Sequence, residues 1–401
     1  MIQTQPIISE KSLSTRLIGE ISGQEKGPTF ILFGGIHGNE PAGILALERV
    51  FDDLKKYSLP IKGKIYGIRG NLKGLSARKR FLDHDLNRLW TNSNIPIIRN
   101  KAPEERSVEE AELMEIYALL KEILDTNTAP FYFIDIHTTS SRTVPFITIN
   151  DALINRRFSR CFPLPVVLGI EEYLHGPLLS YINERGYLAV GIESGQHDAV
   201  EAVDNAISFI WIALVSAELI PASELPELKV HYHKLKNATY GNRSFYEILS
   251  RRELFPGDQF KMEEGFQSFE KIPEGILLAE HNGEEILAPK DSIIFMPLYQ
   301  VLGKEGFFFI RKIPIWALRV SEVLRKFKWD NFFSLFPGVS WTANKESLKV
   351  NIKIAKFFRK PIFHLFGYRR GVLEGNKVVM SNRESKSKKD MYKHTAWFRR
   401  K

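Results

Sequence analysis

Over roughly its first 222 residues the chain alternates short apolar runs with longer amphipathic segments, and this pattern constrains the fold more than any other feature. We expect strands at Thr29–Phe33, Lys64–Arg69, Phe131–His137, Val144–Ile149 and Leu188–Glu193. We expect helices at Pro41–Lys56, Ser107–Leu124 and Asp198–Ala217, the second of which opens with a capping-box spacing. Strands that alternate with helices predict an α/β fold with a mostly parallel mixed sheet flanked by helices.

The chain has 401 residues, more than one hydrophobic core usually organises, so we expect more than one domain. Near residue 222 helical periodicity gives way to short strand-like pieces broken by turns, and Asn282-Gly283 is a strong hairpin signal. We therefore predict an α/β catalytic domain over residues 1–222, a small β domain over 223–320, and a basic, aromatic-rich extension over 321–401.

Composition excludes several classes of protein. The single cysteine, Cys161, rules out an internal disulfide framework and a cysteine-rich zinc module. The start resembles no secretory leader and no apolar run has membrane-spanning length, so we expect a soluble, cytoplasmic protein. The net charge is +9, but residues 321–401 hold 20 Lys and Arg against 6 Asp and Glu, a local charge of +14 that leaves −5 for the rest. The basicity therefore belongs to the extension alone.

Two motifs offer metal ligands. His37 and Glu40 lie three residues apart on a glycine-rich strand-to-helix turn, where an imidazole and a carboxylate can converge on one ion. Asp135 and His137 end an apolar strand and share one of its faces. Taken alone, His137 could equally be a hydrogen-bonded histidine at a strand end. Together His37, Glu40 and His137 form a three-ligand set that leaves a fourth position for water, the arrangement of a catalytic zinc site.

Two further segments offer groups for chemistry on a bound substrate. Glu193 ends another apolar strand and can act as a general base or acid, although such a residue can also cap a helix or form a salt bridge. The stretch 78–88 mixes four basic residues with acids and an amide. Arginine grips carboxylates in a bidentate fork, so a site that reads an amino-acid carboxylate would use such a segment.

The four motifs GGIHGNE, RFLDHDLNR, DIHTTS and GIESGQ, in this order, resemble the succinylglutamate desuccinylase/aspartoacylase family, a branch of the zinc carboxypeptidase-like fold. The resemblance covers roughly residues 28–310 and implies an α/β catalytic domain followed by a small β domain. It implies that one zinc ion is bound by the residues matching HGNE and DIH, that Glu193 is the general acid/base and that Arg80 polarises the scissile carbonyl. It further implies that Asn87 and Arg88 bind the amino-acid carboxylate, and that Asp135 supports His137 from behind.

The activity implied is hydrolysis of the amide of an N-acyl amino acid by metal-activated water. A zinc carboxypeptidase acting on peptides uses the same kind of zinc site and remains an alternative. A catalytically inactive binding protein with a nucleic-acid- or membrane-binding tail is a second alternative, which a missing ligand or base would favour. None of the four matching positions is missing its residue.

The sequence departs from the family where specificity is set. Aspartoacylases carry an arginine about ten residues before the GIE-type strand end, and here Asn183 falls near that position, with Arg185 and Arg142 as substitutes that no motif supports. N-acetylaspartate is therefore not the expected substrate. Tyr299 is a candidate for the tyrosine that the family's β domain sends to the active site, or else a residue of the β core.

The extension lies outside the resemblance, and three interpretations are open. Its Lys and Arg interleaved with Phe and Trp suit nucleic acid or an amphipathic membrane-surface element. The third interpretation is an appended substructure whose aromatic residues pack on the catalytic domain, and the lack of an RNP-like motif, zinc finger or regular basic helix favours it. Residues 381–401 are polar and charged, so we expect a frayed tail there.

Overall fold

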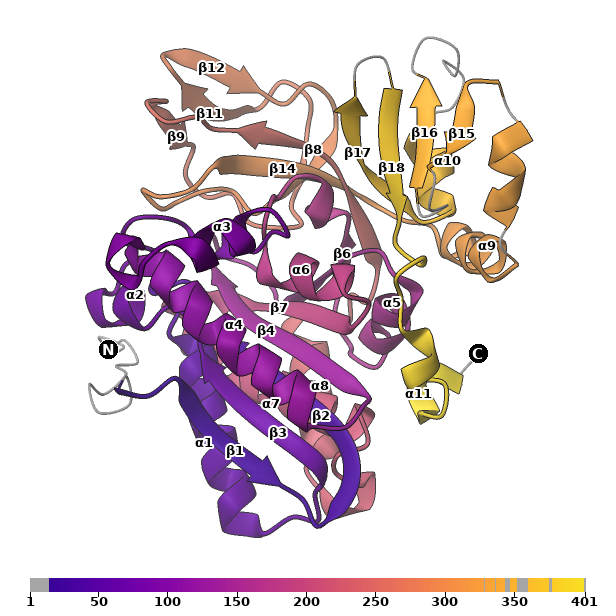
Figure 1. Ribbon diagram of the computed structural model, residues 1–401. Helices are drawn as coiled ribbons and strands as arrows, with labels where there is room; N and C mark the ends of the chain where they lie inside the picture. The colour runs from indigo at the N-terminus through magenta and orange to yellow at the C-terminus, as the bar shows by residue number, and fades with distance from the viewer. Residues whose placement is uncertain are drawn as a thin grey trace.

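A computed structural model describes residues 14–327, 329–335, 337–342, 347–351, 360–374 and 377–399. Its centre is a large mixed sheet with helices on both faces (Figure 1). Within the described residues the strands of this sheet, in spatial order, are β1 (Leu17–Ser22), β3 (Lys62–Arg69), β2 (Glu25–Gly34), β4 (Phe131–Thr139), β7 (Leu188–Gln196), β5 (Phe146–Ile149), β6 (Val166–Leu168), β8 (Phe245–Glu253), β14 (Glu305–Lys312), β13 (Ser292–Phe295) and β10 (Lys271–Ile272). The predicted mixed sheet flanked by helices is confirmed.

The strands that matter for function are parallel neighbours. β3, β2, β4 and β7 run in one direction, while β1 on the edge and β5 beyond β7 run against them. The expected strand Val144–Ile149 is shorter than predicted, because pairing with β7 begins at Phe146. Parallel strands place their carboxyl ends at one edge, so the residues that end β2, β4 and β7 meet there.

Helices cover the two faces of the sheet and bury separate cores. On one face α1 (Ala42–Tyr57), α7 (Val200–Ser216) and α8 (Leu228–Ala238) pack over residues such as Phe30 and Ile134. On the other face α3 (Asn94–Asn100), α4 (Val108–Thr126) and α6 (Leu178–Glu184) pack over Ile31 and Phe133. The α4 helix begins with the predicted capping box, since Ser107 and Glu110 each bond the other's backbone N–H. Shorter helices complete this part: α2 (Leu72–Ala77) and α5 (Leu153–Ser159).

Strands after residue 222 serve two sheets. β8 pairs with β6, so it carries the large sheet on into β14, β13 and β10. β9 (Phe260–Met262), β11 (Leu277–His281) and β12 (Glu284–Leu287) form a separate sheet. The predicted hairpin at Asn282-Gly283 is confirmed, because both residues have positive φ (55° and 80°) between β11 and β12. The domain boundaries at 222 and 320 stay predictions.

The extension has its own small sheet and core. Helix α9 (Ile315–Lys326) and a 3-10 turn, η6 (Trp329–Leu335), lead to a sheet with strand order β15, β16, β18, β17 (Val339–Trp341, Ser347–Asn351, Lys377–Asn382, Tyr368–Glu374) and to helix α10 (Lys360–Leu365). Side chains such as Phe333 and Tyr368 are buried between them. Among the described residues, no helix has both the length and the apolar character needed to cross a bilayer.

A buried ionic cluster joins the extension to the α/β part. Asp151, which follows β5, is fully buried, and its carboxylate accepts hydrogen bonds from Arg156, Arg325 (3.0 Å) and Arg369 (3.0 Å). Burial opposes ionisation of Asp151, but the three guanidinium groups hold its pKa well below the usual range. Arg369 also binds Glu172 at 2.8 Å. We call this set (Asp151, Arg156, Glu172, Arg325, Arg369) the Asp151 cluster.

The prediction of a frayed tail at residues 381–401 is wrong for the part that the structure describes. The chain ends in a short helix, α11 (Ala396–Arg399), that lies against α5 (Figure 1). Tyr392 is fully buried, and its hydroxyl donates to the carbonyl of Phe131 at 2.5 Å and accepts from the N–H of Leu188 at 3.0 Å. Trp397 packs in the same core. Two aromatic anchors therefore dock a segment whose average composition is polar.

Candidate active site

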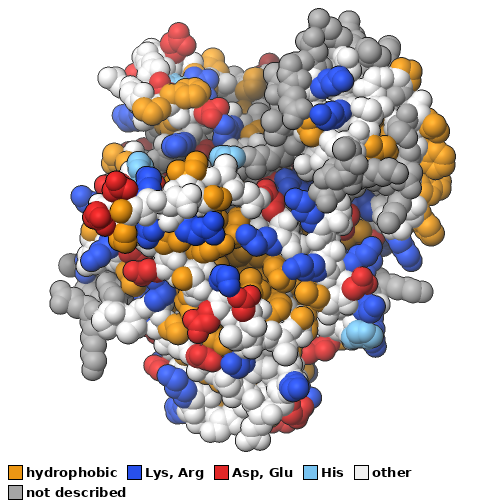
Figure 2. All heavy atoms as spheres, in the orientation of Figure 1, with side chains coloured by type: hydrophobic (Ala, Val, Ile, Leu, Met, Phe, Trp, Pro, Cys, Tyr) orange, Lys and Arg blue, Asp and Glu red, His pale blue; other side chains and the backbone are white. Residues whose placement is uncertain are grey.

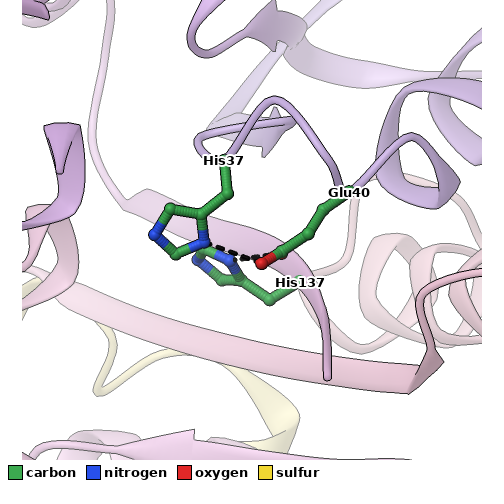
Figure 3. Close-up of side chains that lie close together, drawn as sticks. All are labelled: His37, Glu40 and His137. Carbon is green, nitrogen blue, oxygen red and sulfur yellow. Dashed lines mark hydrogen bonds and ion pairs between the residues drawn. The ribbon is translucent and has the colours of Figure 1, made fainter. Parts of the chain in front are cut away.

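The predicted ligand residues meet at the carboxyl edge of the sheet. After β2 the chain makes a tight turn through His37 to Glu40 before α1 begins, and the turn needs glycine at position 38, where a Cβ would lie 2.0 Å from the carbonyl carbon of Gly74. His137 comes from the neighbouring strand β4. One ligand atom of each of these three side chains lies within 4.8 Å of the others, and all three side chains are buried. Figure 3 shows the two imidazoles facing the Glu40 carboxylate.

Each histidine is held by a carboxylate on either side. The Nδ1 atoms of His37 and His137 lie 2.7 and 3.0 Å from the two oxygens of Glu40. Their Nε2 atoms lie 3.2 Å from Asp85 and 2.7 Å from Asp135. Such outer carboxylates fix the tautomer of a metal-ligating imidazole, and here they turn both Nδ1 atoms toward the centre.

The trio fits a zinc ion on its own chemistry. Two imidazole nitrogens and one carboxylate oxygen are the protein ligands of many catalytic zinc sites. Burial works against ionisation of Glu40, but the two histidines hold its pKa well below the usual range. Burial likewise opposes the charged form of His137, yet Asp135 and Glu40 raise its pKa well above the ordinary value. Both pKa shifts arise from the attraction between a buried carboxylate and neighbouring positive charge.

Glu193 lies beside this trio. It is paired with His137 in the parallel register of β4 and β7, so its side chain reaches the same edge. It is buried, and its Oε2 atom has no hydrogen-bond partner among the described residues. Burial raises the pKa of Glu193 to about 8; His137 and Arg80 oppose the rise, and the negative charges of Glu40 and Asp135 add to it. Near neutral pH this carboxyl group therefore holds a proton that it can exchange.

Stretch 78–88 wraps around the trio. The buried carboxylate of Glu109 holds its backbone, accepting from the N–H groups of Leu82 (2.7 Å), Asp83 and His84 (both 3.0 Å). Arg80 is thereby placed with Nη1 3.6 Å from Glu40 and Nη2 3.2 Å from Asp85. Its guanidinium group faces the centre of the site.

Asn87 and Arg88 continue the same wall. The side-chain oxygen of Asn87 accepts from the N–H of Leu178 at 2.9 Å, which leaves its amide N–H groups for another partner. Arg88 Nη2 lies 3.2 Å from Glu305 at the start of β14. The amide and guanidinium groups on this wall are donors suited to a carboxylate.

All seven predicted site residues border one cavity of about 130 Å³. The sequence prediction missed other polar groups that line the cavity or support its residues, among them Asp85, His197, Gln300 and Glu305. His197 bonds Thr138 through Nδ1 (2.8 Å) and Gln300 through Nε2 (3.3 Å). Asp85 lies within the motif RFLDHDLNR, between Arg80 and Arg88. An acidic residue between two arginines of a site motif could have been predicted to pair with them. Gln300 lies in a loop and Glu305 begins β14; both are distant in sequence from the motifs and carry no sequence signal.

The structure places the remaining specificity candidates outside this cavity's lining. Asn183 donates to Leu179 and accepts from Asn155, so its amide is used within the protein. Arg185 stacks on Tyr181 with 4.5 Å between guanidinium carbon and ring centroid. Arg142 borders a different hollow. The hydroxyl of Tyr299 donates to the carbonyl of Glu263 at 2.8 Å.

Comparison with known proteins agrees with this architecture. Residues 26–207 match the family described as Succinylglutamate desuccinylase/Aspartoacylase catalytic domain. A succinylglutamate desuccinylase of Burkholderia lata is 29% identical over 114 residues, 28% of this chain and 31% of that protein. The match thus spans less than a third of the curated relative's length.

Solved structures extend the likeness over most of the chain. The succinylglutamate desuccinylase of Vibrio parahaemolyticus superposes with a TM-score of 0.54 at 16% identity, covering 74% of this chain and 86% of that one. The enzyme of the same name from Chromobacterium violaceum gives 0.53 at 16% identity, covering 76% and 96%. Likeness at this identity shows the fold. Residues 26–207 thus match the catalytic domain of the succinylglutamate desuccinylase/aspartoacylase family, and the likeness of fold extends over 74% of the chain.

Proposed function

We propose that this protein is a zinc-dependent hydrolase that removes the acyl group from an N-acyl amino acid. The observation that carries the proposal is the convergence of His37, Glu40 and His137 beside Glu193, a buried carboxyl group whose pKa is raised to about 8. Three protein ligands with an adjacent proton carrier are the parts that metal-assisted amide hydrolysis needs.

The chain's own residues take distinct roles in this proposal. A zinc ion held by the trio would supply Lewis-acid chemistry that polarises a carbonyl oxygen and acidifies water. Glu193 carries the proton that the departing amine nitrogen must receive when the C–N bond breaks. Arg80 directs its N–H groups at the carbonyl oxygen, where negative charge develops. Asn87 and Arg88 bind the carboxylate of the amino acid.

The number of cations that line the cavity limits the number of carboxylates that a substrate can carry. Among the described residues that line the cavity, Arg80 and Arg88 are the only ones of the Lys and Arg type. Each of them already faces a protein carboxylate, Asp85 and Glu305 respectively. Both ring nitrogens of His197 already have partners. A second substrate carboxylate would enter without a cation of its own, and burying an unpaired charge is strongly unfavourable. We therefore assign a substrate with a single carboxylate.

Part of the remaining cavity wall is apolar, beside polar side chains such as Thr148, Asn150 and Ser180. The apolar side chains that border the cavity are those of Ile149, Ile170, Leu174, Leu179 and Phe308. Apolar walls gain free energy by removing aliphatic groups from water. The substrate that fits is an N-acyl amino acid whose remaining part is aliphatic, such as N-acetylleucine, in contrast to N-acetylaspartate or N-succinylglutamate.

A zinc carboxypeptidase is the nearest rival. The small cavity and the segment from Met296 to Gln300 that borders it favour a small amide over a long peptide. An inactive binding protein is disfavoured because the three ligands and Glu193 come together. The rates at which zinc-loaded protein hydrolyses N-acetylleucine, N-acetylaspartate and a tetrapeptide distinguish these functions. The proposal requires that N-acetylleucine is hydrolysed faster than the other two substrates.

Glu193→Gln tests the assignment of the proton carrier. The variant should lose turnover by about 10²–10⁴-fold, the usual contribution of general acid–base catalysis. It should retain about one zinc per chain by metal analysis, since Glu193 is outside the ligand trio. Full activity in this variant would contradict the role of Glu193. Wild-type protein that neither binds zinc nor hydrolyses any amide of the panel would overturn the proposed function.

A further inference from the structure

Helix α9 buries Leu318 together with two polar residues and leaves several large apolar side chains exposed. The side turned into the protein carries Ser321, whose hydroxyl donates to Leu365 at 2.6 Å, and Arg325 of the Asp151 cluster. The side turned outward carries Trp316, Val320 and Val323, and Phe327 follows the helix directly. Positions 316, 320, 323 and 327 form one stripe at helical spacing. A surface helix usually buries such a stripe.

The exposed apolar area continues beyond the helix. Trp329, Phe332 and Leu335 of η6 are also exposed, and together with Ile315 and the α9 stripe these side chains are 41% to 76% accessible. We call this set the α9 face. In Figure 2 hydrophobic side chains gather at the edge of the molecule where Figure 1 places α9 and the segment after it. A run of large exposed apolar side chains of this kind marks an interaction site.

The charges on the α9 face are positive. Arg319 and Lys326 are exposed on the same side of the helix, and the Nζ of Lys326 lies 5.9 Å from the ring centroid of Phe327. Glu322 is the acidic residue of α9, and Arg157 and Arg160 of the α/β part bind its carboxylate. The described side chains of the helix therefore present cations and aromatic rings outward without a free anion.

The exposed aromatic residues and the neighbouring cations together indicate which kind of partner the α9 face binds. Trp and Phe on an apolar stripe flanked by Lys and Arg are typical of helices that lie in the interface of an anionic bilayer. A second copy of the chain would bring like charges together, which is unfavourable. Nucleic acid is recognised chiefly through its phosphates, and the middle of the face is apolar. We propose that the α9 face docks the protein on the surface of a membrane rich in anionic lipid.

The docking does not involve the cavity residues. None of the residues of the α9 face lines the cavity, and the Asp151 cluster connects helix α9 to Asp151 beside the lining residue Asn150. Binding to lipid can therefore be measured without any assay of hydrolysis. Its failure would leave the proposed deacylase function standing.

Vesicle flotation of the full chain tests the proposal. The protein should float with vesicles of phosphatidylcholine and phosphatidylglycerol, stay behind with phosphatidylcholine alone, and be released at high salt. The double variant Trp316→Gln/Phe327→Gln should bind the anionic vesicles at least about tenfold more weakly. Both side chains are exposed, so the substitutions leave the fold intact, which circular dichroism checks.

A matched control replaces exposed apolar residues elsewhere: Val230→Gln/Phe255→Gln should bind like wild type. Arg319→Glu/Lys326→Glu should also weaken binding at least about tenfold, because it reverses both cations. Three results would overturn the proposal: no flotation of wild type at low salt, equal binding to neutral vesicles, or a dimer in solution that the Trp316→Gln/Phe327→Gln variant abolishes. The last result would make the face an interface between copies.

Discussion

Replacing Asp151 by Asn should lower the free energy of unfolding by about 3–5 kcal/mol. The substitution keeps the shape of the side chain but removes the one carboxylate that Arg156, Arg325 and Arg369 share, and that carboxylate is fully buried. Removing one partner of a buried ion pair leaves uncompensated charge, which costs about this much. Glu172 still neutralises part of the charge of Arg369, so the lower end of the range applies.

Urea unfolding followed by tryptophan fluorescence measures this loss. The matched control is Asp125→Asn, the same substitution in the exposed pair with Lys121 (2.6 Å), where we expect less than about 1 kcal/mol. A loss for Asp151→Asn that is no larger than the control's would refute the reasoning that the extension is held by internal charge.

The pH dependence gives a second test of the same prediction. The folded pKa of Asp151 is depressed, so its contribution is fully present above the unfolded value of about 3.9 and is lost as pH falls through the folded value. The difference in stability between wild type and Asp151→Asn should therefore be constant near neutral pH and shrink below about pH 4. A difference that stays unchanged at acid pH would contradict the assignment.

Three further predictions address the site and the tail. Asp135→Asn should weaken zinc binding by about 10–100-fold in a chelator competition, since the carboxylate orients His137 through Nε2; an unchanged affinity would remove Asp135 from this role. Glu305→Gln frees Arg88 for the substrate carboxylate, so KM should fall severalfold with kcat nearly constant, and a rise in KM would show instead that Glu305 positions Arg88. Tyr392→Phe should cost about 2 kcal/mol in urea unfolding because two buried hydrogen bonds are lost, whereas Tyr240→Phe at an exposed position should cost nothing measurable.

The sequence was sufficient to predict that His37, Glu40 and His137 come together, because each lies near the end of a strand or on the turn that follows one. Strand alternation placed Asp135 and His137 on one face, and the glycine turn placed His37 near Glu40. What the pattern does not contain is strand order. That β2 and β4 are neighbours follows from the whole sheet, and the three-dimensional proximity of the trio depends on it.

Other features were beyond a local reading. Glu305 reaches Arg88 across 217 residues of sequence, so no motif connects them. The error about the tail has a related cause, because average polarity outweighed the two residues, Tyr392 and Trp397, that dock it. Helix α9 is a third case, because Ser321 and Arg325 face inward toward Leu365 and Asp151, partners that are distant in sequence and that no local pattern indicates.

The Asp151 cluster also has a consequence for the order of events during synthesis. Asp151 and Arg369 are 218 positions apart, so at about 5–20 residues per second the ribosome delivers the partner about 10–40 s after the carboxylate. Until then β5 is followed by the negative charge of Asp151, and two of its three counter-ions, Arg325 and Arg369, have not yet been synthesised. A nascent chain that stops before Arg369 should therefore leave this corner of the sheet open, so the α/β part closes only after the extension has been synthesised.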